Sequence, residues 1–159
     1  MTGGNSTAED WLKAYTKAVE QLAVDSMQVE LNGGLVRDDA MPTGMTGSLI
    51  ALISEDVSVQ IGFFASQEGC EQFTRQLLMM EPDEEDPNAE DIADALGEIV
   101  NITAGVVKTA MNETHPSITL GLPICLCGKI QTTDQMEVAA GRISLGDETA
   151  QLVVIRSAK

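Results

Sequence analysis

The segment 89–112 constrains the fold more than any other part of the sequence, because its pattern predicts a long amphipathic helix. At about 100° per residue, the apolar face is expected to carry Ile92, Leu96, Ile99, Thr103, Val106 and Ala110, flanked by Ala95 and Ile102. The opposite face carries Asp91, Asp94, Glu98, Asn101, Gly105 and Lys108. A helix of this kind has to bury its apolar stripe against another element, whereas its polar stripe is usually only a solvent face.

Two residues of the polar face are not explained by solvation alone. Glu98 and Asn101 are three residues apart, so their side chains are neighbours on one ridge. Asparagine is a mediocre helix former, and Gly105, one turn further on, costs about 1 kcal/mol relative to alanine. A glycine on this stripe lets another surface approach the helix backbone. These residue types favour a docking ridge, while Asp91 and Asp94 also complement the dipole at the helix N-terminus.

The remaining patterns predict an α+β fold of two layers, a mainly antiparallel sheet packed by three helices. A helix is expected over 8–26, where Thr7 and Asp10 resemble a capping pair, and another over 66–80. Strands are expected over 28–36, 47–53, 57–63, 117–120, 124–131, 136–145 and 149–155.

No linker long enough to divide the 159 residues is visible, so we expect one domain over 1–159, with residues 1–7 flexible. Residues 81–88 are Glu-Pro-Asp-Glu-Glu-Asp-Pro-Asn, and the two prolines argue against a helix there. We interpret this segment as a solvated acidic connecting loop. A binding segment is the alternative interpretation.

The formal net charge of −16 makes nucleic acids and anionic membranes poor partners. The nine lysines and arginines are scattered, without a cluster that would hold a phosphate. The longest apolar run, 49–53, is far too short to cross a bilayer, and the N-terminus lacks the basic start and apolar run of a signal peptide. The expected location is therefore the cytoplasm.

The three cysteines argue against a disulfide framework. Cys125 and Cys127 are two residues apart in a predicted strand, so both point to one face of the sheet. A metal site would need further ligands, yet Cys70 is remote in sequence and His115 is the only histidine. We expect buried thiols, with no metal centre; a metal site is the alternative.

The run Asp94-Ala-Leu-Gly-Glu98-Ile-Val-Asn101-Ile-Thr-Ala-Gly105 resembles the characteristic helix of the CheC/CheX/FliY phosphatases. That helix has an acidic residue, then Glu, two residues, Asn, and a Gly one turn later. The segments 60–64 and 121–128 resemble the CheX type in particular, and the similarity extends over 12–155. The only other Glu-x-x-Asn, from Glu85 to Asn88, lies in the proline-containing loop, so a single usable copy favours CheX over CheC.

The sequence does not predict a self-contained hydrolase, because His115 is alone and there is no glycine-rich phosphate loop or basic clamp. The resemblance implies a composite site with a phosphorylated CheY-like receiver domain, which supplies the acyl phosphate, a lysine and Mg²⁺. This chain would then need no cofactor of its own. The resemblance implies that Asn101 holds the attacking water and that Glu98 pairs with the receiver's lysine. The docking surface around them would include Asp94, Gly105 and Lys108.

The resemblance also implies a homodimer joined through sheet edges, with 124–131 and 136–145 as candidate strands. Two other functions remain open on the sequence. One is a non-catalytic module that binds a phosphorylated receiver, which would have no need of the Asn101 carboxamide. The other is an assembly domain related to flagellar switch components, which would depend on the sheet and not on the ridge.

Overall fold

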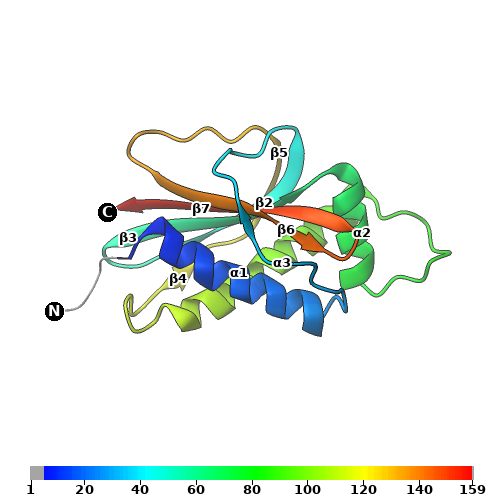
Figure 1. Cartoon of the computed structure of the whole chain (residues 1–159), viewed down its shortest axis with the longest axis horizontal. Coiled ribbons are helices and arrows are strands. Elements are labelled where there is room, and N and C mark those ends of the chain that lie inside the picture. Colours follow the sequence, from blue (N-terminus) through cyan, green and yellow to red (C-terminus); the bar gives the residue numbers. More distant parts are fainter. Residues whose placement is uncertain (1–5, 159) are drawn as a thin grey trace.

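The computed structural model, which describes residues 6–158, has an α+β fold with a seven-stranded antiparallel sheet and three helices (Figure 1). The predicted fold class is confirmed. In chain order the elements are α1 (Ala8–Asp25), β1 (Val36–Arg37), β2 (Met45–Ile53), β3 (Val57–Ala65), α2 (Gln67–Leu77), α3 (Ala89–Ala110), β4 (Thr119–Leu120), β5 (Ile124–Gly128), β6 (Glu137–Leu145) and β7 (Glu148–Ala158).

The helices pack against one face of the sheet, where they enclose the main core (Figure 1). The strands are ordered β1-β6-β7-β3-β2-β4, and β5 pairs with β2 at the same edge as β4. Alternation in β3 is as predicted: Val57, Val59, Ile61 and Phe63 are buried among the helices. Trp11 and Tyr15 of α1 contribute the largest side chains on the helical side.

A capping box sets the first residue of each of the two long helices, α1 and α3. Thr7 and Asp10 form a reciprocal capping box at α1, which confirms the predicted pair. At α3 the Asn88 side chain accepts a hydrogen bond from the Asp91 N–H at 2.8 Å, and the Asp91 carboxylate accepts one from the Asn88 N–H at 3.2 Å. A cap of this kind contributes about 1 kcal/mol. The acidic segment 81–88 is irregular, as expected, and ends in this cap.

A smaller apolar cluster covers the other face of the sheet around the Phe64 ring. A Cβ added to Gly47 would lie 2.3 Å from Phe64 Cδ2, and one added to Gly62 would lie 2.7 Å from Phe64 Cε1. The Phe64 ring therefore requires a glycine at position 47 of the neighbouring strand β2 and at position 62 of its own strand β3. Met41, Met45, Leu49, Leu126 and Ile130 pack around this cluster.

Several predicted boundaries are wrong. The strand expected over 28–36 is reduced to β1 and an isolated bridge between Leu31 and Leu145, because Gln28 and Gly33 adopt left-handed backbone conformations that interrupt an extended chain. The helix expected to reach Met80 ends at Leu77, since Met79 has a φ of 54°. Conversely, β7 continues past the expected end at residue 155, because it pairs with β3 as far as Ala158.

The expectation that Cys125 and Cys127 are buried is also wrong, since both thiols are exposed. They lie on β5, which pairs with β2 alone, so this edge of the sheet has fewer covering neighbours. Cys70 of α2 is buried, and burial raises the pKa of its thiol to about 11. No group of three or more metal-binding side chains suited to an ion occurs among residues 6–158. No helix in this range is long and apolar enough to span a membrane.

His115 is not the isolated residue that the sequence suggested. Its Nε2 lies 2.7 Å from Ser6 Oγ, its Nδ1 lies 3.2 Å from Asp56 Oδ1, and its ring packs 5.3 Å from that of Trp11. The Trp11 indole N–H also donates to Ser6 Oγ, at 2.8 Å. Because an indole can only donate, Ser6 Oγ accepts from Trp11. An ionised carboxylate can only accept, so Asp56 takes the Nδ1 proton of His115, and in this neutral tautomer Nε2 accepts from Ser6.

This buried arrangement joins three segments that are distant in sequence. Ser6 and His115 are buried, and the Ser6 oxygen already accepts from the indole, so the group is structural and not a nucleophile. It ties the residue before the α1 cap to the segment after α3 and to the β2–β3 turn. Of the segment predicted to be flexible, residues 1–5 lie outside the described residues, Ser6 makes these contacts, and Thr7 caps α1.

We expect His115→Ala to lower the free energy of unfolding by about 2–4 kcal/mol, because it removes two hydrogen bonds and leaves a cavity beside Trp11. Urea unfolding followed by tryptophan fluorescence measures this. Glu113→Ala, at an exposed position two residues away, should change stability by less than about 0.5 kcal/mol. Equal stabilities of the two variants would contradict a structural role for the His115 contacts.

Candidate active site

The candidate site lies on the solvent-facing ridge of α3. The buried stripe of this helix includes Ile92, Leu96, Ile99 and Val107, which are packed among α1, β2 and β3. Packing on that side directs the opposite face outward. Asp94, Glu98, Asn101 and Lys108 are exposed there, as predicted from the helical spacing.

The buried stripe is not quite the predicted one. Val106 and Ala110 were expected inside, yet Val106 is 38% exposed and Ala110 is also exposed. Val100 and Ala104 are fully buried instead. The reason is that α3 contacts both the sheet and α1, so its buried surface is wider than a single stripe. Ile102, 39% exposed, lies next to Asn101 on the accessible side.

Glu98 and Asn101 border a shallow hollow of about 370 Å³. Its other wall is the turn before β5, where Leu122 is 85% exposed and Pro123 packs against α3. A Cβ on Gly97 would meet Pro123 Cβ at 3.4 Å, an ordinary contact, so this glycine is not required by space alone. Among the described residues, none forms a hydrogen bond or ion pair with the side chain of Glu98 or Asn101. Both groups are therefore available to a partner.

The five predicted site residues fall into two groups. Asp94, Glu98 and Asn101 line the same hollow. Gly105 and Lys108 lie further along the helix and do not line it. Nothing lies within 4 Å of a Cβ built on Gly105, so its backbone faces open space.

The structure adds two residues that sequence reasoning did not select. Leu122 and Pro123 form the wall opposite the ridge, although the chain reaches them some twenty residues after Asn101. The signal that could have pointed to them is their place in the segment 121–128, which resembles the CheX type, although neither residue was selected for the site. Which helix such a turn would face depends on the pairing of β5 with β2, which residue patterns do not specify.

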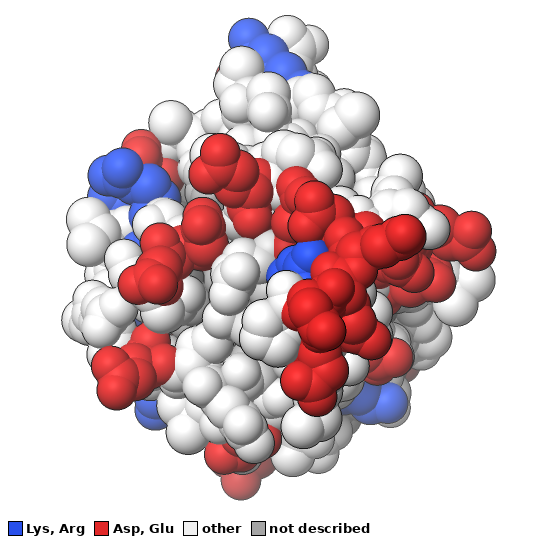
Figure 2. All heavy atoms as spheres, turned by 90° about the vertical axis from the view of Figure 1, so that its right-hand side faces the viewer, with Lys and Arg blue, Asp and Glu red and all other residues white. Residues whose placement is uncertain are grey.

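The surface beside the ridge is strongly acidic. Figure 2 shows Asp and Glu side chains gathered over the end of the molecule that carries α2 and the loop 81–88, with few basic side chains among them. Among the described residues, no basic side chain lines the ridge hollow, and its charged side chains are Asp94 and Glu98. A phosphate would be repelled from this surface unless a partner brought positive charge with it.

The fold is similar to that of several solved structures. The crystal structure of a CheC-like superfamily protein from Shewanella sp. PV-4 has a TM-score of 0.76 at 16% identity, covering 93% of this chain and 97% of the other. The chemotaxis protein CheX from Vibrio vulnificus has a TM-score of 0.76 at 16% identity, with 93% and 99% covered. The CheX–CheY–BeF3–Mg²⁺ complex from Borrelia burgdorferi has a TM-score of 0.75 at 18% identity, covering 93% of this chain and 98% of the other.

The chain thus shares its overall fold with these structures. Residues 47–144 match the model of the family described as chemotaxis phosphatase CheX, which spans more than half of the chain. The chain belongs to the CheX family. No curated protein matches it in sequence.

Proposed function

We propose that this protein hydrolyses the aspartyl phosphate of a CheY-like receiver domain. The observation that carries the proposal is the exposed pair Glu98 and Asn101, held on a rigid helix without partners among the described residues, in a member of the CheX family. The CheX of Borrelia burgdorferi has been crystallised with CheY, BeF3 and Mg²⁺. A receiver of that kind is the partner proposed for this chain.

Asn101 is proposed to position the attacking water. A carboxamide both donates and accepts hydrogen bonds, so it can orient a water molecule in line with the phosphorus. Positioning and electrostatic stabilisation are the main contributions available to a protein in phosphoryl transfer. The exposed location of Asn101 on α3 allows this group to enter the partner's site without a rearrangement of the fold.

Glu98 is proposed to pair with the receiver's lysine. Its carboxylate would repel the phosphoryl group, so it has to meet a cation in the complex. It is one turn from Asn101 on the same ridge, and a rigid helix would therefore transmit the register set by this ion pair to the water-positioning amide. The Mg²⁺ would be held by the receiver, and this chain is proposed to need no metal of its own.

Replacing Asn101 by alanine should lower kcat for receiver dephosphorylation by roughly 100-fold, because the amide that orients the water is removed. The KM for the phosphorylated receiver should stay nearly unchanged. Loss of phosphate from a ³²P-labelled receiver at several protein concentrations separates the two constants. Asn112→Ala, an exposed asparagine just beyond α3, is the matched control and should behave as the wild type. Near wild-type kcat in Asn101→Ala would refute the positioning role.

Replacing Glu98 by glutamine should raise KM as well as lower kcat, because the side chain keeps its shape but loses the charge that attracts lysine. The KM of the wild type should also rise with added salt, and that dependence should be weaker in Glu98→Gln. Glu90→Gln, an exposed acid in the first turn of α3, controls for the general loss of one negative charge. An equal effect of the two substitutions would mean that no specific pair forms at Glu98.

We further propose a homodimer joined through β5. Of the two predicted segments, β5 lies at a sheet edge, whereas β6 lies between β1 and β7, with only two residues paired to β1. An edge strand offers unpaired backbone groups to a second copy. Light scattering at micromolar concentration should give twice the chain mass, and Ile124→Lys, at a 64% exposed position of β5, should reduce it to that of the monomer because a charge on an edge strand opposes pairing with a second copy. A monomer mass for the wild type would exclude this dimer.

A further inference from the structure

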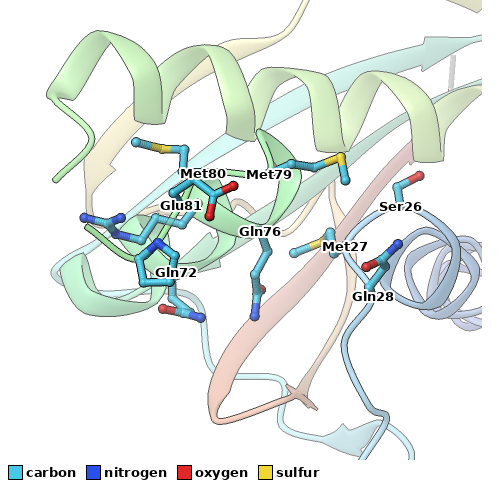
Figure 3. A pocket seen from close by; sticks show the side chains of 10 residues that line it. Ser26, Met27, Gln28, Gln72, Gln76, Met79, Met80 and Glu81 are labelled. Carbon is cyan, nitrogen blue, oxygen red and sulfur yellow. The ribbon is translucent and has the colours of Figure 1, made fainter. Parts of the chain in front are cut away.

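A groove runs from the proposed catalytic ridge along α2. Two adjoining hollows of about 590 and 560 Å³ form it, and they share Ser26, Gln28 and Met79. We call it the α2 groove. It is lined by residues 25–28 at the end of α1 and just after it, by residues 72–82 of α2 and the turn that follows, and by 94–98 of α3. Figure 3 shows the hollow farther from the ridge, with side chains from the turn after α1 and from α2.

The α2 groove carries exposed apolar side chains near the junction of its two hollows. Leu78 is 50% exposed and Met79 is 73% exposed, with Met27 and Met80 more deeply placed beside them. Met79 has a φ of 54°, a left-handed conformation that is unfavourable for a residue with a Cβ. The chain thus holds an apolar, flexible side chain in solvent at the junction of the two hollows, at an energetic disadvantage. Methionines of this kind adapt to the surface of a partner.

The rim of the α2 groove is acidic. Asp25, Glu81, Asp94 and Glu98 line it. Its one basic residue among those described, Arg75, is already committed: its guanidinium lies 2.7 Å from the Asp86 carboxylate and donates to the Glu84 carbonyl at 3.1 Å. Figure 2 shows that acidic side chains dominate this end of the molecule. Exposed apolar side chains within an acidic rim are complementary to a segment that carries both apolar and basic side chains.

We propose that the α2 groove binds a basic, amphipathic segment of the same receiver whose phosphate is removed at the ridge. This inference rests on the proposed function. Its structural basis is continuity, because Asp94 and Glu98 line both the α2 groove and the ridge, and Asp94 also lines the hollow at Asn101. A receiver whose lysine reaches Glu98 therefore extends over the adjoining hollow, where Leu78 and Met79 meet its apolar side chains and Asp25 meets its basic ones.

The groove would act on affinity and not on chemistry. The Asn101 amide lies outside it, and nothing in the groove reaches the water that Asn101 holds. Substitutions in the part of the groove away from Asp94 and Glu98 should therefore change KM and leave kcat as it is. The groove would thereby select among receivers that share the same active-site lysine but differ in the segment next to it.

The test uses Met79→Gly, Leu78→Ser and Asp25→Asn in the full chain. Glycine suits the left-handed conformation at position 79, so that variant keeps the turn while losing the side chain. Each substitution should raise KM for the phosphorylated receiver by about five- to tenfold with unchanged kcat, the effect of losing one well-buried interface side chain. Val36→Ser, at a 60% exposed position outside the groove, is the control and should match the wild type.

The outcomes separate this inference from the proposed function. If the wild type is active and the groove variants keep its KM, the groove has no part in receiver binding, although the phosphatase stands. If the wild type shows no activity, the proposed phosphatase function is refuted. The role of the groove is then tested by measuring how tightly the protein binds the Mg²⁺–beryllofluoride form of the receiver. Weaker binding by the three variants than by Val36→Ser would then support the proposal, and equal or undetectable binding would overturn it.

Discussion

The packing of one stripe of α3 against the sheet and α1 is the interaction on which the rest of the site depends. Ile92, Leu96, Ile99 and Val107 are almost completely buried, so the helix cannot rotate without exposing apolar surface. Its start is set by the Asn88 cap. The ridge that carries Glu98 and Asn101 is therefore rigid before any partner arrives, and little conformational freedom is lost when the two proteins meet.

Under the proposed function, electrostatics would divide the chemistry between two proteins. The chain would contribute a carboxylate and a carboxamide at the ridge, where its surface repels phosphate. The cations that phosphoryl transfer requires would then come from the receiver. The same acidic surface extends over the α2 groove, where the apolar side chains of Leu78 and Met79 would supply contacts that charge alone would not. Charge would attract the partner, and the ridge and groove together would set its orientation.

Local residue patterns were sufficient for most of the elements. The capped α1, the alternation of β3 and the amphipathic α3 were all predicted, because caps and periodicity act over a few residues. Contacts between segments that are remote in sequence were not predicted. The expected strand at 28–36 failed at Gln28 and Gly33, Cys125 and Cys127 proved exposed, and His115 joins residues 59 and 109 positions away.

The sequence by itself determined the helix periodicity that puts Asp94, Glu98 and Asn101 on one face, together with the motif that resembles the CheX family. Only the tertiary structure decided what stands beside that face: the turn of Leu122 and Pro123 on one side and the α2 groove on the other. The physical reason is that side-chain spacing along a helix follows from backbone geometry, which is local. Which strand edge or turn faces the helix follows from sheet pairing and core packing, and these depend on the whole chain at once.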